Sequence, residues 1–415
     1  MESVKRLLNS FGKWEYAELL VLVLVTLALH LSIIMQPDRP LFDEHHYVSD
    51  AGLILEGEGT ERTEHPPLGK LLIASGIRLF GDNPFGWRFF SVLSGTIGTI
   101  LFYLICRQLT LSRKASFLAT FLLALENLSF VQASIAMLDV YSLVFTMGAF
   151  WLYLRGNYAM SGVAIGLSAL AKLSGVLALP VIGLHWFLTG WKRPWRFLTS
   201  MLLAPVAFLL LMPLFDFIIW HKWFNPIERM GTMLRLSSSI TNAQYPDVGS
   251  RPWEWILFPE VMPYWWTPNY TGMISPTLWA FILPVVIYIT FRAIKGNTPV
   301  LLPFAWFLGT YLIWIPISLI TDRVTYIYYF YFTIGAICIG LGIISSQLPD
   351  IASKASKIRW LIRLVVPIYI LGHLVAFIVL APVSLWWSIP LSLLLYIFSF
   401  RFLGFGRRLE LPSTL

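Results

Sequence analysis

The chain has 415 residues, of which 57% are hydrophobic and 13% are charged, and its 30 Lys and Arg outnumber its 22 Asp and Glu to give a net charge of +8. An ordinary soluble domain is roughly a quarter charged, so this composition excludes a soluble enzyme, a disordered regulator and a secreted disulfide scaffold. Twelve membrane spans of about 20 residues would use roughly 240 residues and leave about 175 for loops, which predicts an all-α polytopic membrane protein.

Apolar runs along the chain predict about 12 transmembrane helices, within a range of 11–13. The first run follows Lys5, Arg6 and Lys13, and no small-residue cleavage site comes after it, so we expect a retained helix and not a cleaved signal peptide. Cys106 and Cys338 lie inside apolar runs and are expected to pack as small hydrophobic residues. The runs lie at 17–36, 86–107, 115–132, 138–154, 158–173, 175–190, 197–219, 276–291, 300–320, 325–345, 361–380 and 383–400.

Basic residues occur in every second loop between these runs. These loops and both termini are predicted to be cytoplasmic, because positively charged loops stay on that side during insertion. The pattern predicts a multi-pass protein of the cell membrane with its active site facing outside, and it gives no reason to expect a nucleic-acid partner. The basic residues are Arg107, Arg113, Lys114, Arg155, Lys192, Arg193, Arg196, Arg292, Lys295, Lys354, Lys357, Arg359, Arg401, Arg407 and Arg408.

Two long segments lie on the predicted outer side of a single domain, 1–415. Segment 36–85 is rich in acidic residues and contains an amphipathic stretch at 71–80, and segment 221–275 is rich in aromatic residues and proline. Residues 276–415 are predicted to form the C-terminal helices. Long loops in a compact protein usually carry function, so we expect these two outer segments to build the functional site.

The first outer segment carries the strongest signal for chemistry. Asp43 and Glu44 follow the first predicted helix by a few residues, and the run 64–71, with the letters EHPPLGKL, comes about twenty residues later. Two prolines stiffen that turn and permit a helix to begin directly after it. The arrangement predicts that His65 and Lys70 lie at the same water–lipid boundary as Asp43.

Ionisable residues at the ends of predicted helices form a second signal, because a charged side chain in a membrane span is costly and marks a functional candidate. For Asp139 and Lys172 the alternative is a structural ion pair between helices. Asp216 has no expected companion on its side of the membrane and is predicted to be structural. The residues predicted to lie on the same side as Asp43 are Glu126, Asp139, Lys172, Asp322 and Arg323.

The histidines and carboxylates do not have the spacing of a zinc site held by the protein alone. A loosely held Mg²⁺ or Mn²⁺, bound through Asp43 and Glu44 together with a phosphate, stays open as a cofactor. The sequence contains neither a phosphate-binding loop nor a dinucleotide fingerprint, which argues against a nucleotide-driven pump.

Several motifs in combination resemble those of the protein O-mannosyltransferase family, whose members have the GT-C architecture and draw sugars from polyprenyl-phosphate carriers. The likeness is dense over 42–190, moderate over 250–345 and thin beyond that. The motifs are Phe42-Asp43-Glu44, Glu64-His65-Pro66-Pro67-Leu68-Gly69-Lys70-Leu71, Gly86-Trp87-Arg88, Ala136-Met137-Leu138-Asp139, Ala171-Lys172-Leu173-Ser174-Gly175 and Arg251-Pro252-Trp253-Glu254-Trp255.

The resemblance implies an inverting enzyme that moves a sugar, mannose above all, from a polyprenyl or dolichyl phosphate to a Ser/Thr hydroxyl of a protein. It makes Asp43 the catalytic base, and Glu44 the residue that orients the acceptor or the donor sugar. The residues expected to bind the donor phosphate or sugar are Lys172, Arg323, Asp139, His65 and Arg251. Those expected to cover the sugar or the acceptor are Glu126, Trp253 and Trp255.

The sequence also departs from the family pattern. Glu126 stands where family members commonly have aspartate, and Ser134 stands where they have an arginine, which bears on how the carrier phosphate or the acceptor is held. The luminal β-trefoil insert of eukaryotic members is missing, because the second outer segment has only about 55 residues. These features are similar to those of the compact prokaryotic branch.

Two alternatives remain at this stage. Many spans with intramembrane charges also describe a transporter or flippase of lipid-linked sugars, but transporters place such charges near the midplane and show repeated halves. The same donor chemistry could serve a glycan or a lipid acceptor, since no acceptor motif occurs; the HPPLGK and RPWEW runs favour a protein. Some family members act as dimers, and a dimer stays open for this chain.

Overall fold

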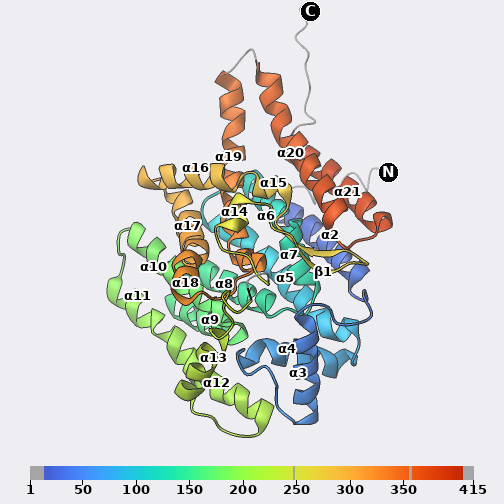
Figure 1. The fold of residues 1–415 in the computed structure, drawn as a ribbon. Coiled ribbons are helices and arrows are strands. Elements are labelled where there is room, and N and C mark those ends of the chain that lie inside the picture. The colour runs from blue at the N-terminus through green and yellow to red at the C-terminus, as the bar shows by residue number, and fades with distance from the viewer. Residues whose placement is uncertain (1–13, 246–247, 355–357, 405–415) are drawn as a thin grey trace, which may run out of the picture.

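The structure is a computed structural model that describes residues 14–245, 248–354 and 358–404. Helices make up nearly all of its regular structure (Figure 1). The strands in the described part, β1 (Met262–Trp265) and β2 (Tyr270–Gly272), pair as one antiparallel hairpin. Inside a bilayer a helix satisfies all of its own backbone hydrogen bonds, so the predicted all-α class follows from the composition and is confirmed.

The first half of the chain contributes the helices that surround the site described below. They are α2 (Ala17–Ile33), α3 (Glu44–Glu56), α4 (Pro67–Phe80), α5 (Pro84–Gln108), α6 (Arg113–Ala124), α7 (Asn127–Ser134), α8 (Leu138–Leu154), α9 (Tyr158–Ala171), the 3-10 turn η1 (Leu173–Leu177) and α10 (Ala178–Leu188).

The second half contains the second outer segment and the C-terminal helices. Its elements are α11 (Pro194–Met201), α12 (Leu203–Trp220), α13 (Pro226–Ser237), α14 (Glu254–Leu257), α15 (Pro276–Trp279), α16 (Ile282–Ile294), α17 (Thr298–Phe307), the π-helical turn η2 (Leu308–Leu312), α18 (Trp314–Thr321), the 3-10 turn η3 (Ile327–Phe332), α19 (Ile334–Lys354), α20 (Arg359–Leu380) and α21 (Leu385–Leu403).

In the described residues, 6 helices are long and apolar enough to cross a membrane, or 7 if α6 and α7, bent by 61° at the break between them, form one span. The predicted number of about 12 therefore stays a prediction. The six are Pro84–Gln108, Pro194–Trp220, Pro276–Ile294, Thr298–Thr321, Arg359–Leu380 and Leu385–Leu403. Shorter apolar helices lie at Ala17–Ile33, Leu138–Leu154, Tyr158–Ala171, Leu173–Leu188 and Ile334–Leu348.

Local sequence signals set where several helices begin. The side chain of Ser112 accepts a hydrogen bond from the backbone N–H of Ala115, which caps the start of α6. Asn83 caps α5 in the same way, and Pro84 follows it at the first helical position. The stretch predicted to be amphipathic forms most of α4, which buries one face and leaves Leu79 and Phe80 exposed.

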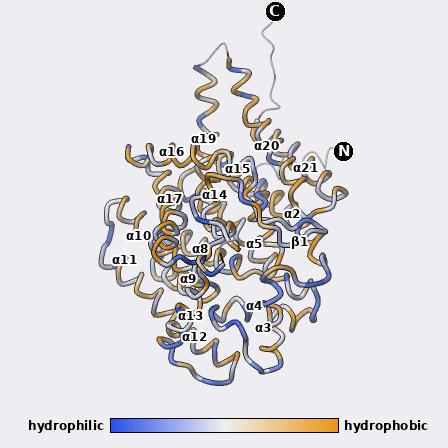
Figure 2. The backbone as a smooth tube through the Cα atoms, viewed as in Figure 1, coloured by the Kyte–Doolittle hydropathy of each residue, from blue (hydrophilic) through white to orange (hydrophobic). Residues whose placement is uncertain are grey.

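Apolar side chains occupy the interior and also cover the outside of the peripheral helices. Figure 2 shows hydrophobic residues throughout the helices and hydrophilic residues concentrated in the connections, notably beside α3 and α4. Leu210 in α12, Ile287 in α16 and Trp386 in α21 are exposed to 68%, 69% and 89%. Such surfaces fit a lipid environment. Cys106 and Cys338 are buried and free, as the sequence predicts.

Polar contacts gather four helix ends on one side of the bundle. Glu18, buried at the start of α2, accepts hydrogen bonds from Tyr103 Oη and from Arg113 Nε, each at 2.8 Å. Lys114 Nζ donates to the carbonyl oxygen of Leu403 at 2.7 Å. The starts of α2 and α6 and the ends of α5 and α21 therefore lie at one end of the bundle, in agreement with the predicted alternation of basic loops. That this end is cytoplasmic stays a prediction.

The opposite side of the bundle carries the end of α2 and the residues with candidate chemistry. There α3, α4, α12 and α13 lie together, away from the projecting hairpin of α19 and α20 (Figure 1). Asp216 in α12 does have a companion, contrary to expectation, because Arg229 Nε in α13 lies 3.5 Å from its carboxylate. Arg229 also donates to the carbonyl oxygen of Thr63 at 2.6 Å, so this pair ties α13 to the first outer segment.

Candidate active site

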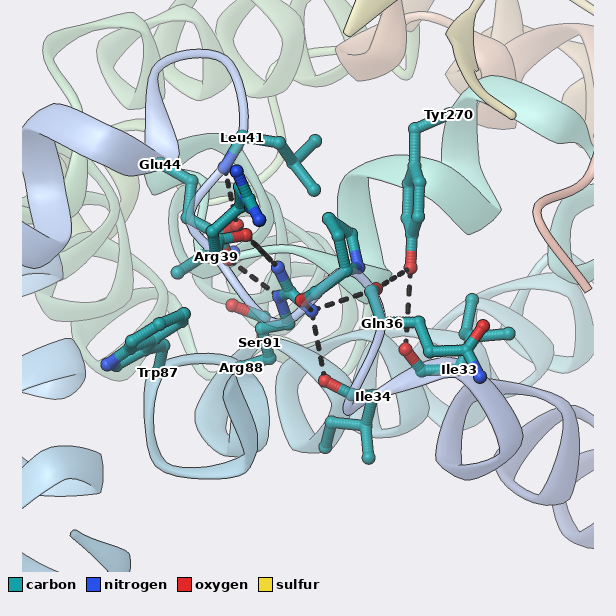
Figure 3. Close-up of polar contacts among 12 residues, drawn as sticks. Ile33, Ile34, Gln36, Arg39, Leu41, Glu44, Trp87, Arg88, Ser91 and Tyr270 are labelled. Atoms are coloured by element: carbon teal, nitrogen blue, oxygen red, sulfur yellow. Dashed lines mark hydrogen bonds and ion pairs between the residues drawn. The ribbon is translucent and has the colours of Figure 1, made fainter. Parts of the chain in front are cut away.

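A buried ion pair fixes the loop that leads into α3 (Figure 3). Arg88, in α5, is fully buried and donates from Nε and Nη2 to the two carboxylate oxygens of Glu44, each at 2.9 Å. Its other bonds go to the backbone carbonyl oxygens of Ile34, Gln36, Pro37 and Arg39. One guanidinium thus holds four positions of the loop between α2 and α3, together with the first residue of α3.

Glu44 has no acceptor position left for a substrate. Besides Arg88, its oxygens accept from the backbone N–H groups of Leu41 at 3.1 Å and Ala136 at 2.9 Å. A carboxylate has about four lone-pair sites, and these contacts fill all of them. The structure therefore shows Glu44 in a structural role, holding the Arg88 guanidinium and the backbone N–H groups of Leu41 and Ala136.

Asp43 directly precedes α3 and is partly buried among groups from three other elements. Tyr328, Lys172, Asp139 and Arg62 all lie close enough to its carboxylate to act on it electrostatically. Phe42, immediately before it, stacks on Tyr264 with ring centroids 4.5 Å apart. Asp43 is thus held on both sides, by Phe42 and by Glu44.

Lys172 and Asp139 form the ion pair that the sequence left as an alternative. Lys172 Nζ donates to the two carboxylate oxygens of Asp139 at 2.8 and 2.7 Å. Lys172 follows the last residue of α9 in extended backbone, and Asp139 lies in the first turn of α8. The ammonium also lies over the rings of Tyr328 and Tyr329, at 5.1 and 5.6 Å from their centroids. The pair therefore links two helices and faces Asp43 at the same time.

His65 belongs to the cluster, whereas Lys70 does not. Tyr47 Oη lies 3.4 Å from His65 Nε2, and burial together with the positive charges of Lys172 and Lys70 lowers the pKa of His65 well below its usual value. His65 is therefore neutral at pH 7. Lys70 is buried with Asp50, 2.7 Å away, and also bonds the carbonyl oxygen of Arg62, so it fastens the turn and is not presented at the surface.

Two further cations lie nearby, Arg323 directly after α18 and Arg251 in the second outer segment. Arg323 Nη2 lies 3.3 Å from Tyr329 Oη, beside the ring that faces Lys172. Arg251 Nη2 donates to Asp322 Oδ1 at 2.8 Å, and its Nη1 bonds Ser318 Oγ at 3.2 Å. Arg323 thus points to the cluster, while the Arg251 guanidinium is already engaged in joining the second outer segment to α18.

Of the three residues predicted to cover a sugar or an acceptor, Glu126 and Trp255 are fully buried. Glu126 is fully buried and accepts from the backbone N–H groups of Ser129 and Ser275, so it caps α7. Trp255 is fully buried as well, and its indole N–H donates to Ser250 Oγ at 2.9 Å. Trp253 is partly exposed, with the Arg251 guanidinium 5.9 Å above its ring. Of the three, Trp253 alone offers a free surface.

The tyrosines of η3 are site residues that sequence reasoning missed. Tyr328 contacts Asp43 and Lys172, and Tyr329 contacts Lys172 and Arg323. A signal was present, because the run TYIYYFYF at 325–332 opens an otherwise apolar stretch with four tyrosines. Because the run opens an apolar stretch, its pattern predicts a membrane span, and that prediction gives the tyrosine hydroxyl groups no role.

The described residues hold no group of three or more His, Cys, Asp or Glu side chains that could hold a metal ion. The arrangement considered from the sequence, a Mg²⁺ or Mn²⁺ shared by Asp43 and Glu44, does not fit, because Arg88 and two backbone N–H groups occupy the Glu44 oxygens.

An apolar groove of about 440 Å³ lies between α10 and the segment from η2 to α18. Trp314 lies between the lining residues Ile313 and Ile315 in the chain and packs on Tyr329 with ring centroids 4.7 Å apart, which connects this part of the chain to the charged cluster. The groove is lined by Pro180, Leu184, Leu308, Gly309, Leu312, Ile313, Ile315 and Pro316.

Comparison with known proteins supports the resemblance found in the motifs. Residues 64–220 match the family described as dolichyl-phosphate-mannose-protein mannosyltransferase. A polyprenol-phosphate-mannose–protein mannosyltransferase of Mycobacterium tuberculosis is 33% identical over 191 residues, which are 44% of this chain and 35% of that protein. Its namesake in Corynebacterium glutamicum is 26% identical over 304 residues, 61% of this chain and 57% of that protein.

A third relative has a different printed activity. An undecaprenyl phosphate-α-4-amino-4-deoxy-L-arabinose arabinosyl transferase of Pseudomonas fluorescens is 37% identical over 162 residues, covering 35% of this chain and 28% of that protein. The matched parts of these curated relatives therefore amount to between about a quarter and just over half of their length.

Solved structures show the same fold. The S. cerevisiae protein O-mannosyltransferase Pmt1-Pmt2 complex bound to the sugar donor superposes with a TM-score of 0.67 over 89% of this chain and 90% of that chain, at 12% identity. ArnT from Cupriavidus metallidurans superposes with a TM-score of 0.54 over 93% and 76%, at 16% identity. These superpositions confirm the predicted GT-C fold, and the match over residues 64–220 supports the resemblance to the O-mannosyltransferase family for that part of the chain.

Replacing Glu44 by Gln tests the structural role of the buried pair. Breaking such a pair by removing one charge costs about 3–5 kcal/mol, because the other charge stays buried. The Gln side chain would also point its own N–H group at one of the N–H groups from which Glu44 accepts. We expect a clear fall in the thermal unfolding midpoint of Glu44→Gln in detergent. Glu56→Gln, an exposed change in the same helix, should cost less than about 0.5 kcal/mol. Equal midpoints for the two variants would contradict the assignment.

Proposed function

We propose that this chain belongs to the protein O-mannosyltransferase family and is an inverting glycosyltransferase. It moves a sugar, mannose in the first instance, from a polyprenyl or dolichyl phosphate to a Ser/Thr hydroxyl of a protein. The observation that carries the proposal is that Asp43 lies near Lys172 and Tyr328, while Lys172 and Arg323 both contact Tyr329, whose neighbour Trp314 belongs to the segment that lines an apolar groove. The printed activities of the mycobacterial and corynebacterial relatives support mannose and a protein acceptor.

In this proposal the lipid-linked sugar donor occupies both the apolar groove and the charged cluster. The isoprenoid tail lies along the apolar wall of α10 and α18, and the phosphate lies near Lys172 and Arg323. Two of the three hydrogens of the Lys172 ammonium go to Asp139, which orients it and leaves one for a phosphate oxygen. Arg323 forms no ion pair with a carboxylate of the described residues, so it supplies the uncompensated positive charge.

Asp43 acts as the base of a single displacement. The acceptor oxygen forms a bond to the anomeric carbon while the bond from that carbon to the phosphate oxygen breaks, and the hydroxyl proton passes to Asp43. A positioned base typically contributes about 10²–10⁴-fold. The phosphate leaves as an anion, and fixed cations aimed at developing charge are usually the larger contribution. No covalent intermediate forms, so the configuration at the anomeric carbon inverts.

The proposal also covers the side of the membrane that the active site faces and the nature of the acceptor. The loop charges support an active site on the outer face of the cell membrane. A glycan or lipid acceptor is the second candidate, because the sequence carries no acceptor motif. Mass spectrometry of the product formed from a labelled lipid donor, with a Ser/Thr peptide and a lipid acceptor in parallel, distinguishes the two. A dimer stays a prediction for this chain.

Asp43→Asn should lose nearly all glycopeptide formation, at least about 10²-fold, and should still bind the lipid donor, because the amide cannot accept the proton but keeps the shape. Activity is measured with purified protein, a polyprenyl-phosphate sugar and a Ser/Thr peptide. Asp38→Asn, in the same loop with an exposed side chain, is the matched control and should retain full turnover. An Asp43→Asn protein with normal turnover would remove this residue from its role.

Lys172→Ala should weaken binding of the lipid phosphate more than binding of the peptide. Loss of one charge-assisted contact corresponds to roughly tenfold or more in affinity. Binding of undecaprenyl phosphate and the KM for the peptide are measured side by side. Lys222→Ala, an exposed change in the second outer segment, should alter neither. The opposite pattern, with the peptide KM raised and lipid binding intact, would assign Lys172 to the acceptor.

The pH dependence of kcat/KM reports the state of Asp43. Burial raises the pKa of Asp43 to about 6, against the opposing charge of Lys172. Since the ionised carboxylate is the active form, kcat/KM should fall about tenfold per unit as pH drops below about 6 and level off above it. Tyr328→Phe removes a hydroxyl group that favours the ionised form of Asp43, so the inflection should move to higher pH. A flat profile between pH 5 and 8 would count against Asp43.

A further inference from the structure

The second outer segment wraps the residues that follow α18. Backbone hydrogen bonds join Val324 N–H to the carbonyl oxygen of Ile240 at 3.1 Å and Ser250 N–H to the carbonyl oxygen of Thr325 at 2.8 Å. The Thr325 hydroxyl donates back to the carbonyl oxygen of Ser250 at 2.6 Å. Residues 240–242 and 249–250 therefore hold 322–325 from two sides, and Arg323 lies in the middle of the held stretch.

Asn242 makes the central contacts of this wrapping. Its side-chain Nδ2 donates to the carbonyl oxygens of Asp322 at 2.8 Å and of Arg323 at 2.9 Å, and its backbone N–H donates to the carbonyl oxygen of Asp322 at 2.8 Å. The residue is 8% exposed. A buried carbonyl oxygen without a partner is costly, so Asn242 satisfies two acceptors that α18 leaves at its end.

These contacts set the direction of Arg323. Asp322 ends α18 in the left-handed region with φ of 50°, a conformation that a non-glycine residue keeps only when its surroundings hold it. With both flanking carbonyl oxygens fixed by Asn242, the Arg323 side chain leaves the backbone toward Tyr329. Its charge also acts on His65, in the first outer segment. Arg323 thus reaches the cluster only from this backbone geometry.

We propose that Asn242 is a positioning residue for the donor phosphate: it holds Asp322 and Arg323 so that the Arg323 guanidinium meets the phosphate of the lipid-linked sugar. The inference rests on the proposed function. It makes the second outer segment part of the donor site, besides any contact that it forms with the acceptor. Asn suits the task because its amide N–H₂ group offers two donors to two carbonyl oxygens, which neither Asp nor Ser provides.

Asn242→Asp tests this with the full chain in detergent and undecaprenyl phosphate as the probe. The change keeps the shape and turns an acceptor toward two carbonyl oxygens. We expect binding of the probe to weaken about tenfold, the equivalent of one or two lost hydrogen bonds, while the peptide KM stays within twofold. Asn269→Asp, the same change at an exposed position of the same outer segment, is the control and should bind the probe as the unchanged chain does.

A double-mutant cycle separates positioning from general damage. In an Arg323→Ala background, Asn242→Asp should weaken binding by less than twofold, because the group that it positions is gone. An equal loss in both backgrounds, or unchanged binding in Asn242→Asp alone, overturns the inference and leaves the proposed function standing. Unchanged binding in Arg323→Ala alone removes Arg323 from the phosphate site and overturns both.

A second variant serves as a control for misfolding. Asn242→Ala deletes the two donors without adding a charge and should show the same split between probe binding and peptide KM. Thermal midpoints of all variants are measured before binding. Unfolding of both Asn242 variants would show that the residue is needed for stability alone, and this result would overturn the positioning role.

Discussion

One buried pair of charges decides where the candidate base lies. Taking Glu44 and Arg88 out of water costs several kcal/mol per ion, and the structure offsets this by giving every acceptor of Glu44 and every nitrogen of the guanidinium a partner. Those partners are mostly backbone groups of the loop between α2 and α3. The loop therefore has one conformation at low energy, and Asp43, next to Glu44, inherits its position. The Glu44–Arg88 pair therefore affects the proposed reaction indirectly, by fixing the position of Asp43.

The cluster that faces Asp43 combines a compensated cation with an uncompensated one. Asp139 takes two hydrogens of Lys172 and neutralises it, which allows the ammonium to stay at the end of a membrane helix without a ligand. Arg323 has Tyr329 as its partner and keeps its full charge. An anionic phosphate would meet one preoriented donor and one net positive charge. This division explains why an ion pair between helices and a phosphate site are compatible readings of the same two residues.

Both outer segments contribute to one site, and neither completes it alone. The first supplies Asp43 and His65, and the second presents Arg323 through the contacts of Asn242. Arg229 in α13 joins the two segments by bonding both Asp216 and Thr63. Because α12 and α18 also carry the membrane-facing surface, the geometry of the polar cluster depends on how these helices sit in lipid.

The sequence by itself determined the helical class, most helix positions and which charged residues lie at helix ends, because hydropathy and loop charge are local properties that a bilayer selects directly. It also led to Asp43, Asp139 and Lys172, which the fold brings together. Only the tertiary structure decided that Glu44 pairs with Arg88, that Glu126 and Trp255 are buried in structural roles, that Lys70 is paired with Asp50, and that Tyr328 and Tyr329 line the site. Those outcomes depend on partners that are 20 to more than a hundred residues away in the chain. A carboxylate or an indole ring looks the same in sequence whether packing satisfies it inside the protein or leaves it free for a ligand.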